Sequence, residues 1–348
     1  MMKMFAIYTV CFILFPIIVL YGTKRKEQAE CLLTKKETDA IKGIATCFII
    51  FAHLVNLLET AGVGYFKLLN LYSVTGGMGV LLFFFVSGYG IYKGYIGRKP
   101  DASFWKRRME NVLLPYVILK LSFFLIELVL GLQSFQIRSF LLMFVSDWFI
   151  DVILIQYLIF YLAWKISWMV GKNGKGAFFI CNFVLSAVVA IIFWRLNFVA
   201  RWYNGLFLFP VGMLIANYES ELVKLWNKKW ITGLCINLLA FLMLGLIFAT
   251  NKGELWADVI KTFAGIFLAL LTYQILLRFD LNSKVMCYIG KKSLYYYIAH
   301  MSVIAILSKF SVVDATSAFF LVWILTYLAT IVFEKINSGI IEGLKICK

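Results

Sequence analysis

The chain has 348 residues, of which 62% are hydrophobic and only 15% are Lys, Arg, Asp or Glu. Soluble domains are about 45–50% apolar, so this chain carries more apolar surface than one water-soluble core can bury. Its formal net charge is +16, but the basic residues fall in short clusters between apolar runs. This pattern is typical of membrane helices and argues against nucleic acid as a partner. Anionic lipid head groups or a phosphate-bearing cosubstrate fit the same basic clusters.

Eleven apolar runs approach the length of about 20 residues that a helix needs to cross a bilayer. They predict an all-α, polytopic transmembrane helix bundle of about 11 helices. In chain order the expected spans are residues 5–22, 41–58, 78–96, 112–131, 148–170, 177–194, 203–218, 231–249, 259–277, 293–308 and 316–334. The runs that begin near residues 203 and 293 are the shortest.

The loops alternate in charge along the chain. Most Lys and Arg residues follow the first, third, fifth, seventh and ninth runs, whereas Arg138, Arg195 and Arg201 lie in the other loops. The positive-inside rule then places the N-terminus outside and the C-terminus in the cytoplasm. The first run lacks a small-residue cleavage pattern and is followed at once by Lys24-Arg25-Lys26. We therefore expect a retained anchor instead of a signal peptide.

The seven cysteines are scattered, and none belongs to a C-x-x-C pair. They are Cys11, Cys31, Cys47, Cys181, Cys235, Cys287 and Cys347. Most lie in apolar runs, where cysteine behaves as a small hydrophobic residue. We therefore expect neither a metal site nor a disulfide framework.

Only two histidines occur, His53 and His300, and both lie inside apolar runs. Ionisable groups in hydrocarbon are costly and usually face the bundle interior or a wet cavity. A neutral ring bonded to a neighbouring helix is the alternative. At about 1.5 Å per residue, His53 lies about 16 Å from Lys42 and His300 about 12 Å from Lys292. Both helices begin at the cytoplasmic side, so both rings are expected near mid-membrane.

Lys42 and His53 are separated by eleven residues, which is close to three turns at about 3.6 residues per turn. The two side chains should therefore share one helix face, with a cation at the cytoplasmic end and a base deep in the membrane. This arrangement suits a site in which the cation holds an anionic group while the base reaches a reacting hydroxyl. A lysine that snorkels to phospholipid explains the same spacing.

Two further segments carry candidate site residues. Ser87 precedes Gly88 within a Phe-rich run, where small residues allow close helix contact. Ser87 as a nucleophile is disfavoured because Phe85 stands where a G-x-S-x-G elbow needs glycine. Arg107 and Arg108 then follow in a basic cluster, which fits either positive-inside topology or a clamp for phosphate oxygens.

Polar residues also gather at the outer end of the run over residues 148–170. Asp147 and Asp151 are one helical turn apart there, beside Trp148. Aromatic faces and carboxylates suit the CH faces and hydroxyls of a sugar. An aromatic belt at the membrane interface is the simpler interpretation.

Taken in order, these segments resemble the acyltransferase 3 family of bacterial integral membrane acyltransferases. The matching motifs are Lys42-Gly43 with His53 eleven positions after the Lys, Phe84-Phe85-Val86-Ser87-Gly88-Tyr89, Lys106-Arg107-Arg108 to Pro115-Tyr116, Trp148-Phe149, Phe209-Pro210-Val211-Gly212, and Ile289-Gly290-Lys291-Lys292-Ser293-Leu294-Tyr295-Tyr296-Tyr297 through His300. The chain departs from the family at Lys42 and Asn111, where the family often has Arg. Forked recognition of phosphate does not follow at a lysine.

The resemblance implies a ten-helix membrane acyltransferase domain at residues 37–334. Residues 1–36 would add a transmembrane helix and a basic cytoplasmic loop, and residues 335–348 a short cytoplasmic tail. The implied reaction is O-acylation in the bacterial cytoplasmic membrane. An acetyl-type group would pass from acetyl-CoA or another acyl-CoA to a hydroxyl of an envelope carbohydrate, free or lipid-linked.

The resemblance also implies a role for each candidate residue, with no metal involved. His53 would act as general base or acyl carrier, and His300 and Ser87 would support the site. Lys42 would assist catalysis and would also hold acyl-CoA phosphates together with Arg107 and Arg108. Asp147, Trp148 and Asp151 are the residues expected to contact the acceptor.

Two other functions fit the composition. One is a multi-pass transporter or flippase of a lipid-linked or small polar substrate. Transporters tend to show matching halves with Gly- or Pro-interrupted helices, whereas this chain has only four prolines and no visible halves. The other is an intramembrane protease that pairs Ser87 with a histidine.

Overall fold

The computed structural model describes residues 2–26, 33–64, 67–145, 147–171, 174–310 and 314–346, and Cys31 and Cys347 lie outside these ranges. Nearly all described elements are helices. In chain order they are α1 (Met2–Thr9), η1 (Val10–Leu14), α2 (Phe15–Leu20), β1 (Lys24–Arg25), α3 (Lys35–Thr60), η2 (Lys67–Leu69), α4 (Asn70–Tyr95), α5 (Ser103–Arg108), η3 (Met109–Leu113), α6 (Leu114–Val129), α7 (Ile137–Leu142), η4 (Met143–Val145), α8 (Trp148–Val170), α9 (Gly174–Arg195), η6 (Ala200–Trp202), α10 (Leu208–Asn217), α11 (Glu219–Lys228), α12 (Trp230–Thr250), α13 (Leu255–Leu276), β2 (Phe279–Asp280), α14 (Lys284–Lys291), α15 (Ser293–Ser308) and α16 (Ala315–Ile346).

Nine helical spans in the described residues are long and apolar enough to cross a membrane, and α10 and α15 are shorter apolar helices. The eleven expected runs fall on these spans in chain order. The prediction of an all-α polytopic bundle is therefore confirmed. The two runs that looked short in the sequence are the two short helices.

Several helices extend beyond their apolar runs. α3 begins at Lys35, six residues before the expected span, because Thr34 and Glu37 form a capping box in which each side chain bonds the other residue's backbone N–H. α16 continues unbroken to Ile346, past the boundary expected at residue 334. Hydropathy does not detect such polar helix ends because it scores apolar content and not capping.

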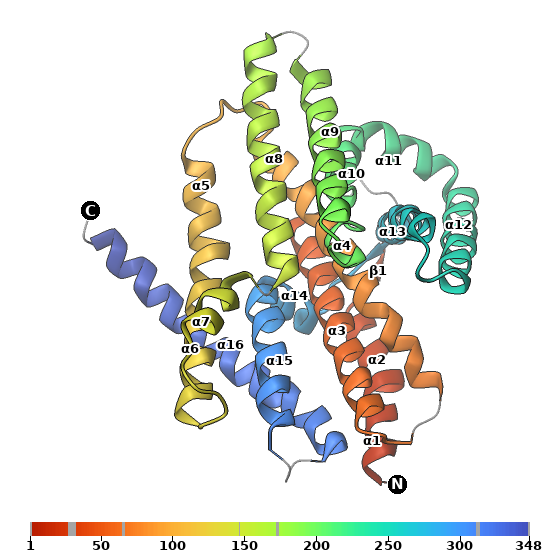
Figure 1. Cartoon of the computed structure of the whole chain (residues 1–348). Coiled ribbons are helices and arrows are strands. Elements are labelled where there is room, and N and C mark those ends of the chain that lie inside the picture. Colours follow the sequence, from red (N-terminus) through yellow and green to blue (C-terminus); the bar gives the residue numbers. More distant parts are fainter. Residues whose placement is uncertain are drawn as a thin grey trace.

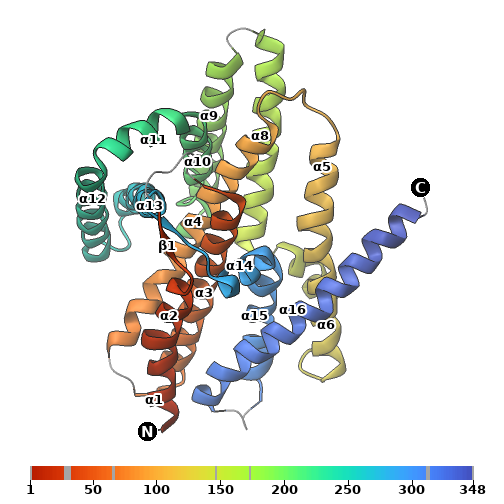
Figure 2. The same cartoon turned by 180° about the vertical axis from the view of Figure 1, so that it is seen from behind.

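The long helices α3 and α4 cross at the centre of the bundle (Figure 1). α10 packs against α4, while α14 and α15 pack against α3. Figures 1 and 2 show the α12–α13 pair on one side of this centre and α5 and α6 on the other. The short strands β1 and β2 pair antiparallel, with Lys24 opposite Asp280. This ladder connects the segment after the N-terminal span to the segment after α13.

Glycines allow the backbones of the central helices to touch. A Cβ added at Gly290 of α14 would lie 1.7 Å from the Asp39 carbonyl oxygen of α3, and one added at Gly43 would lie 2.0 Å from the Met286 oxygen. A Cβ added at Gly88 of α4 would lie 2.0 Å from the Phe209 oxygen of α10. Only glycine permits these approaches. The two crossings fix the positions of the neighbouring residues Lys42 and Ser87.

The span that follows α4 changes its helical winding just before a proline. α5 is continued by the π-helical turn η3, and α6 then begins with Pro115 in its first turn. Proline has no N–H to donate to a carbonyl one turn earlier, and a π turn at this point is a common local adjustment. Arg108 ends α5, and Asn111 lies within the π turn.

Candidate active site

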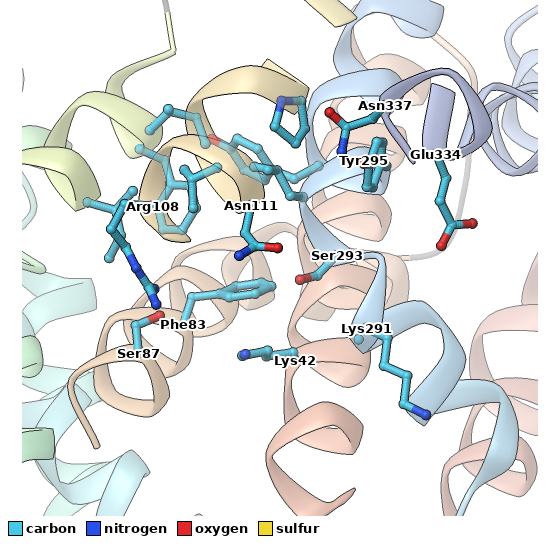
Figure 3. Close-up of a pocket in the computed structure, with 18 of the residues that line it drawn as sticks. Lys42, Phe83, Ser87, Arg108, Asn111, Lys291, Ser293, Tyr295, Glu334 and Asn337 are labelled. Carbon is cyan, nitrogen blue, oxygen red and sulfur yellow. The ribbon is translucent and has the colours of Figure 1, made fainter. Parts of the chain in front are cut away.

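A cavity of about 460 Å³ lies among α3, α4, α8, α15 and the basic start of the α5–α6 span. We call it the inner cavity. Its polar lining residues are Asp39, Lys42, Ser87, Arg108, Asn111, Tyr157, Lys291, Ser293, Tyr295, Tyr297, Glu334, Asn337 and Ser338. Figure 3 shows the Lys42 and Arg108 side chains facing this space from different helices, with the Arg108 guanidinium directed toward Ser87 and Lys291 pointing away. The crossings at Gly43 and Gly88 hold α3 against α14 and α4 against α10, next to Lys42 and Ser87 respectively.

The inner cavity is positively charged. No ion pair of Lys42 or Arg108 occurs among the described residues. The Arg108 guanidinium lies 5.1 Å from the centroid of the Tyr157 ring, and its buried Nε has no hydrogen-bond partner in the described part of the chain. Of the two acidic lining residues, Glu334 is already paired with Lys292. Asp39, the other acidic lining residue, lies one turn before Lys42 on α3 and attracts it electrostatically. Arg108 is therefore the cation most available to an anionic ligand, with Lys42 lining the same cavity.

Arg107 does not line this cavity. Its side chain is exposed, with the guanidinium 5.9 Å from the centroid of the Tyr95 ring. Successive helical residues point about 100° apart, so only one of the two arginines can face inward. The sequence predicted the basic cluster but could not distinguish these neighbours.

A second cavity, of about 220 Å³, contains His53. We call it the outer cavity. His53 lies late in α3, and Trp148 lines the cavity from the first residue of α8. On α3 the inner cavity is lined by Lys42, eleven residues before His53, whereas on α8 its lining begins at Phe149, next to Trp148, and continues to Tyr157. The two cavities are thus displaced along α3 and adjoin at the start of α8 and at Tyr297, and Lys42 and His53 do not share one.

The two histidines lie side by side, with ring centroids 5.3 Å apart. His300 is fully buried, and its Nδ1 lies 3.0 Å from the Tyr296 carbonyl oxygen. Because a carbonyl oxygen only accepts, Nδ1 carries the proton and Nε2 keeps a lone pair. Nε2 has no hydrogen-bond partner among the described residues. The prediction that both rings lie at similar depth agrees with this contact.

Tyr297 separates the cavities, because it lines both of them. Its ring centroid lies 4.9 Å from that of Phe149 and 5.8 Å from that of His300. The sequence showed Tyr297 only as one residue of a motif. Its position depends on how α15 packs against α8, which hydropathy does not report.

The three residues expected to contact the acceptor do not lie in one place. Trp148 lines the outer cavity, whereas Asp147 and Asp151 line neither cavity. Asp147 forms an ion pair with Lys120 at 2.7 Å, and one carboxylate oxygen of Asp151 is buried without a hydrogen-bond partner in the described residues. Their contact with an acceptor stays a prediction without geometric support.

Arg201 and Lys261 line the outer cavity, and neither was singled out as a site residue from the sequence. Lys261 carried a usable signal. It is a lone cation inside the apolar run over residues 259–277, and such residues usually face a cavity. Arg201 lies outside the apolar runs, beside Trp202 in the short helical turn η6, where the sequence indicates an aromatic and polar belt at the outer interface.

A family model described as an acyltransferase domain matches residues 35–334. The chain belongs to the acyltransferase 3 family. No curated protein and no solved structure matches the chain. This membrane acyltransferase carries the outer cavity entirely within the matched residues, whereas the inner cavity extends beyond them to Asn337 of α16.

Proposed function

We propose that this acyltransferase moves an acetyl-type group from acyl-CoA, bound at the inner cavity, to a hydroxyl of a carbohydrate at the outer cavity. The family supplies the reaction class. The observation that carries the assignment of sites is the His53–His300 pair, separated from a cationic cavity only by the wall to which Tyr297 belongs.

The donor is assigned to the inner cavity by charge. Lys42 and Arg108 face a space that also holds the polar side chains of Ser87, Asn111 and Ser293. Arginine presents a planar fork that fits phosphate oxygens, and lysine adds a point charge. In this proposal they hold the phosphates of acyl-CoA, and the acyl end of the molecule reaches toward Tyr297.

The acceptor reaction is assigned to His53 as general base. His53 takes the proton from the acceptor hydroxyl, and the oxygen attacks the thioester carbonyl carbon. The carbon–sulfur bond then breaks, and the CoA thiolate takes the proton back from the imidazolium. The His300 Nε2 lone pair has no hydrogen-bond partner among the residues that the structure describes and lies beside the His53 ring. In the proposed reacting state it accepts a hydrogen bond from one nitrogen of His53, so that the other nitrogen stays unprotonated and faces the acceptor.

Transfer requires a passage at Tyr297. The acyl carbon and the acceptor oxygen must come within about 3–3.5 Å before they react. A rotation of the Tyr297 ring away from Phe149 joins the cavities and supplies that approach. Ser87 lies at the inner cavity while His53 lies at the outer one, which argues against the alternative of a Ser87–histidine protease.

We place the inner cavity at the cytoplasmic face of a bacterial cytoplasmic membrane, with the N-terminus outside. This orientation is supported by the Lys and Arg residues, which concentrate in the loops at the inner-cavity end of the bundle. It also puts the inner cavity where acyl-CoA is made and the outer cavity where envelope carbohydrate is found.

The proposal is tested by His53→Ala in membrane vesicles from source cells that lack the native gene and express either form. Labelled acetyl-CoA is supplied, and label in the carbohydrate and lipid fractions is measured. Because general-base catalysis contributes about 10²–10⁴-fold, we expect the rate to fall by at least about a hundredfold with the KM for acetyl-CoA little changed. A wild-type rate in an equally expressed His53→Ala chain would reject the assignment.

A further inference from the structure

The outer cavity continues sideways into an apolar groove. The groove, of about 590 Å³, lies between α4, α12 and α13. Ser73, Gly77, Leu81 and Lys261 line both spaces. A single ligand can therefore occupy both, with one end beside His53 and the other between the helices.

The groove has the chemistry of a site for an apolar chain. Its walls include Met78 of α4, Phe241 and Leu242 of α12, and Leu268 of α13. Leu242 and Leu246 are more than half exposed on the outside of the bundle. In a membrane this surface meets hydrocarbon, so a lipid chain can enter the groove laterally without crossing water.

Positively charged side chains lie at one end of the groove. Among the described residues, its charged lining residues are Lys252 and Lys261, and the adjoining outer cavity adds Arg201 but no carboxylate. The nearest acidic residue along α13 is Asp258, which instead accepts a hydrogen bond of 2.9 Å from the Asn204 amide. Asp258 forms no ion pair with Lys261 in the described part of the chain. Asp258 attracts Lys261 electrostatically from one turn earlier on α13, but it lines neither space. Among the described residues, no carboxylate lines the cavity or the groove beside these cations.

The distance of Lys252 and Lys261 from the end of the bundle favours a phosphate group beside them. Lys261 lies six residues, or roughly 9 Å, from the start of α13, and Lys252 lies just after α12. The two lysines thus mark a path from the end of the bundle to the outer cavity. A lipid phosphate at the membrane interface reaches this depth, and desolvated cations bind phosphate with charge-assisted hydrogen bonds.

We propose that the acceptor is a glycan linked through phosphate to a long-chain lipid, and that this acyltransferase binds it at the junction of groove and outer cavity. The lipid chain occupies the groove, and the phosphate lies between Lys252 and Lys261. The sugar extends past Arg201 to His53. This inference rests on the proposed function for the role of His53, but the lipid site itself is independent of catalysis.

The test uses the purified full chain in phosphatidylcholine nanodiscs. The probe is a polyprenyl phosphate that carries a photoactivatable diazirine in its chain, and the matched control is the corresponding polyprenyl alcohol. After irradiation, labelled peptides are mapped. We expect the phosphate probe to label the peptides around residues 241–249 and 261–268 about tenfold more than the alcohol does.

Variants distinguish the site from general lipid contact. Lys261→Met should reduce this labelling about tenfold through loss of a charge-assisted contact. Lys67→Met is the control because Lys67 is exposed, precedes α4 at the same end of the bundle and lines neither space. It should leave labelling unchanged. Equal labelling by phosphate and alcohol, or no effect of Lys261→Met, would overturn the inference.

An ordinary phospholipid is the other occupant to exclude. Phosphatidylglycerol added at a tenfold molar excess over the probe should leave most of the labelling intact, whereas its loss would assign the groove to bulk anionic lipid and overturn the proposal. His53→Ala should label as the wild type does. If the wild type is labelled but transfers no acyl group, the proposed function is contradicted and the lipid site is not. If it transfers the acyl group but is not labelled, the lipid site is contradicted and the proposed function is not.

Discussion

At the scale of single residues, the structure shows which of two neighbouring side chains faces a cavity, which the sequence does not show. Arg107 and Arg108 form one basic cluster in the sequence, but only Arg108 lines the inner cavity. His53 and His300 were placed at similar depth by helix geometry, and their rings do lie 5.3 Å apart. Helix geometry thus predicted a depth at which these two rings can approach each other. Which way each side chain faces depends on packing between helices that are distant in the chain.

The arginine pair gives a sharp prediction. Arg108→Gln should raise the KM for acyl-CoA about ten- to a hundredfold, because a hydrogen bond to a charged group contributes about 1.5–3 kcal/mol. Arg107→Gln should change it less than about twofold. Steady-state transfer rates at varied acetyl-CoA concentration give both values. Equal effects of the two substitutions would mean that the phosphates bind outside the inner cavity.

His300 is predicted to act as a positioning residue. His300→Ala should lower kcat about tenfold while the KM for acyl-CoA stays within about twofold, because it removes one hydrogen-bond acceptor beside His53. His300→Gln should restore part of the loss, since the amide oxygen can accept the same bond. A drop in kcat that glutamine does not relieve, together with a raised KM, would instead point to general disruption of the bundle.

At the scale of elements, the motif glycines act as contact points between helices. The small residues at Ser87-Gly88 predicted a close helix contact, and the structure identifies α10 as the partner. The sequence could not identify that partner because apolar periodicity records only that a helix has neighbours. The capped start of α3 and the long end of α16 were missed for a related reason, since both are polar.

Gly88→Ala should destabilise the bundle. The added methyl would lie 2.0 Å from the Phe209 carbonyl oxygen, so α4 and α10 must move apart, at a cost of about 1–3 kcal/mol or more. Gly90→Ala is the matched control, because a Cβ there meets nothing within 4 Å. Thermal unfolding in detergent compares them. Equal melting temperatures for the two variants would show that the crossing is looser than described.

The N-terminal span is connected to the start of α16 by a charged contact. Asp314 accepts hydrogen bonds from Thr316, Lys3 and Ser317, and together they hold the pKa of its carboxyl well below the ordinary value. A lowered pKa means that the stabilisation is present above the unfolded-state value, near 4, and is lost only as the pH falls toward the folded-state value. The contact should therefore survive at pH 4.

Asp314→Asn tests this directly. Hydrogen exchange of the α1 amides, corrected for intrinsic rate, should be slightly faster in the variant than in the wild type at both pH 7 and pH 4. The effect should be small because both side chains are exposed. If the difference between variant and wild type disappears at pH 4, the carboxyl titrates normally and the contact is weaker than the geometry indicates.

At the scale of the whole molecule, two cavities displaced along α3 meet at Tyr297. The sequence predicted eleven apolar runs and an alternation of loop charge, and each run corresponds to an apolar helix of the structure. It could not predict the wall at Tyr297 or the groove beside α12, since both depend on contacts among α4, α8, α13 and α15. In the proposed function, donor and acceptor therefore act from opposite faces of the membrane.

The most direct test of this account is sided acyl transfer in sealed vesicles. Labelled acetyl-CoA, which does not cross a membrane, is added outside inside-out or right-side-out vesicles from source cells that express the chain. We predict label in the carbohydrate and lipid fractions only with inside-out vesicles, and in neither preparation with His53→Ala. Equal transfer in sealed right-side-out vesicles would contradict a donor site at the cytoplasmic face and a route between the cavities past Tyr297.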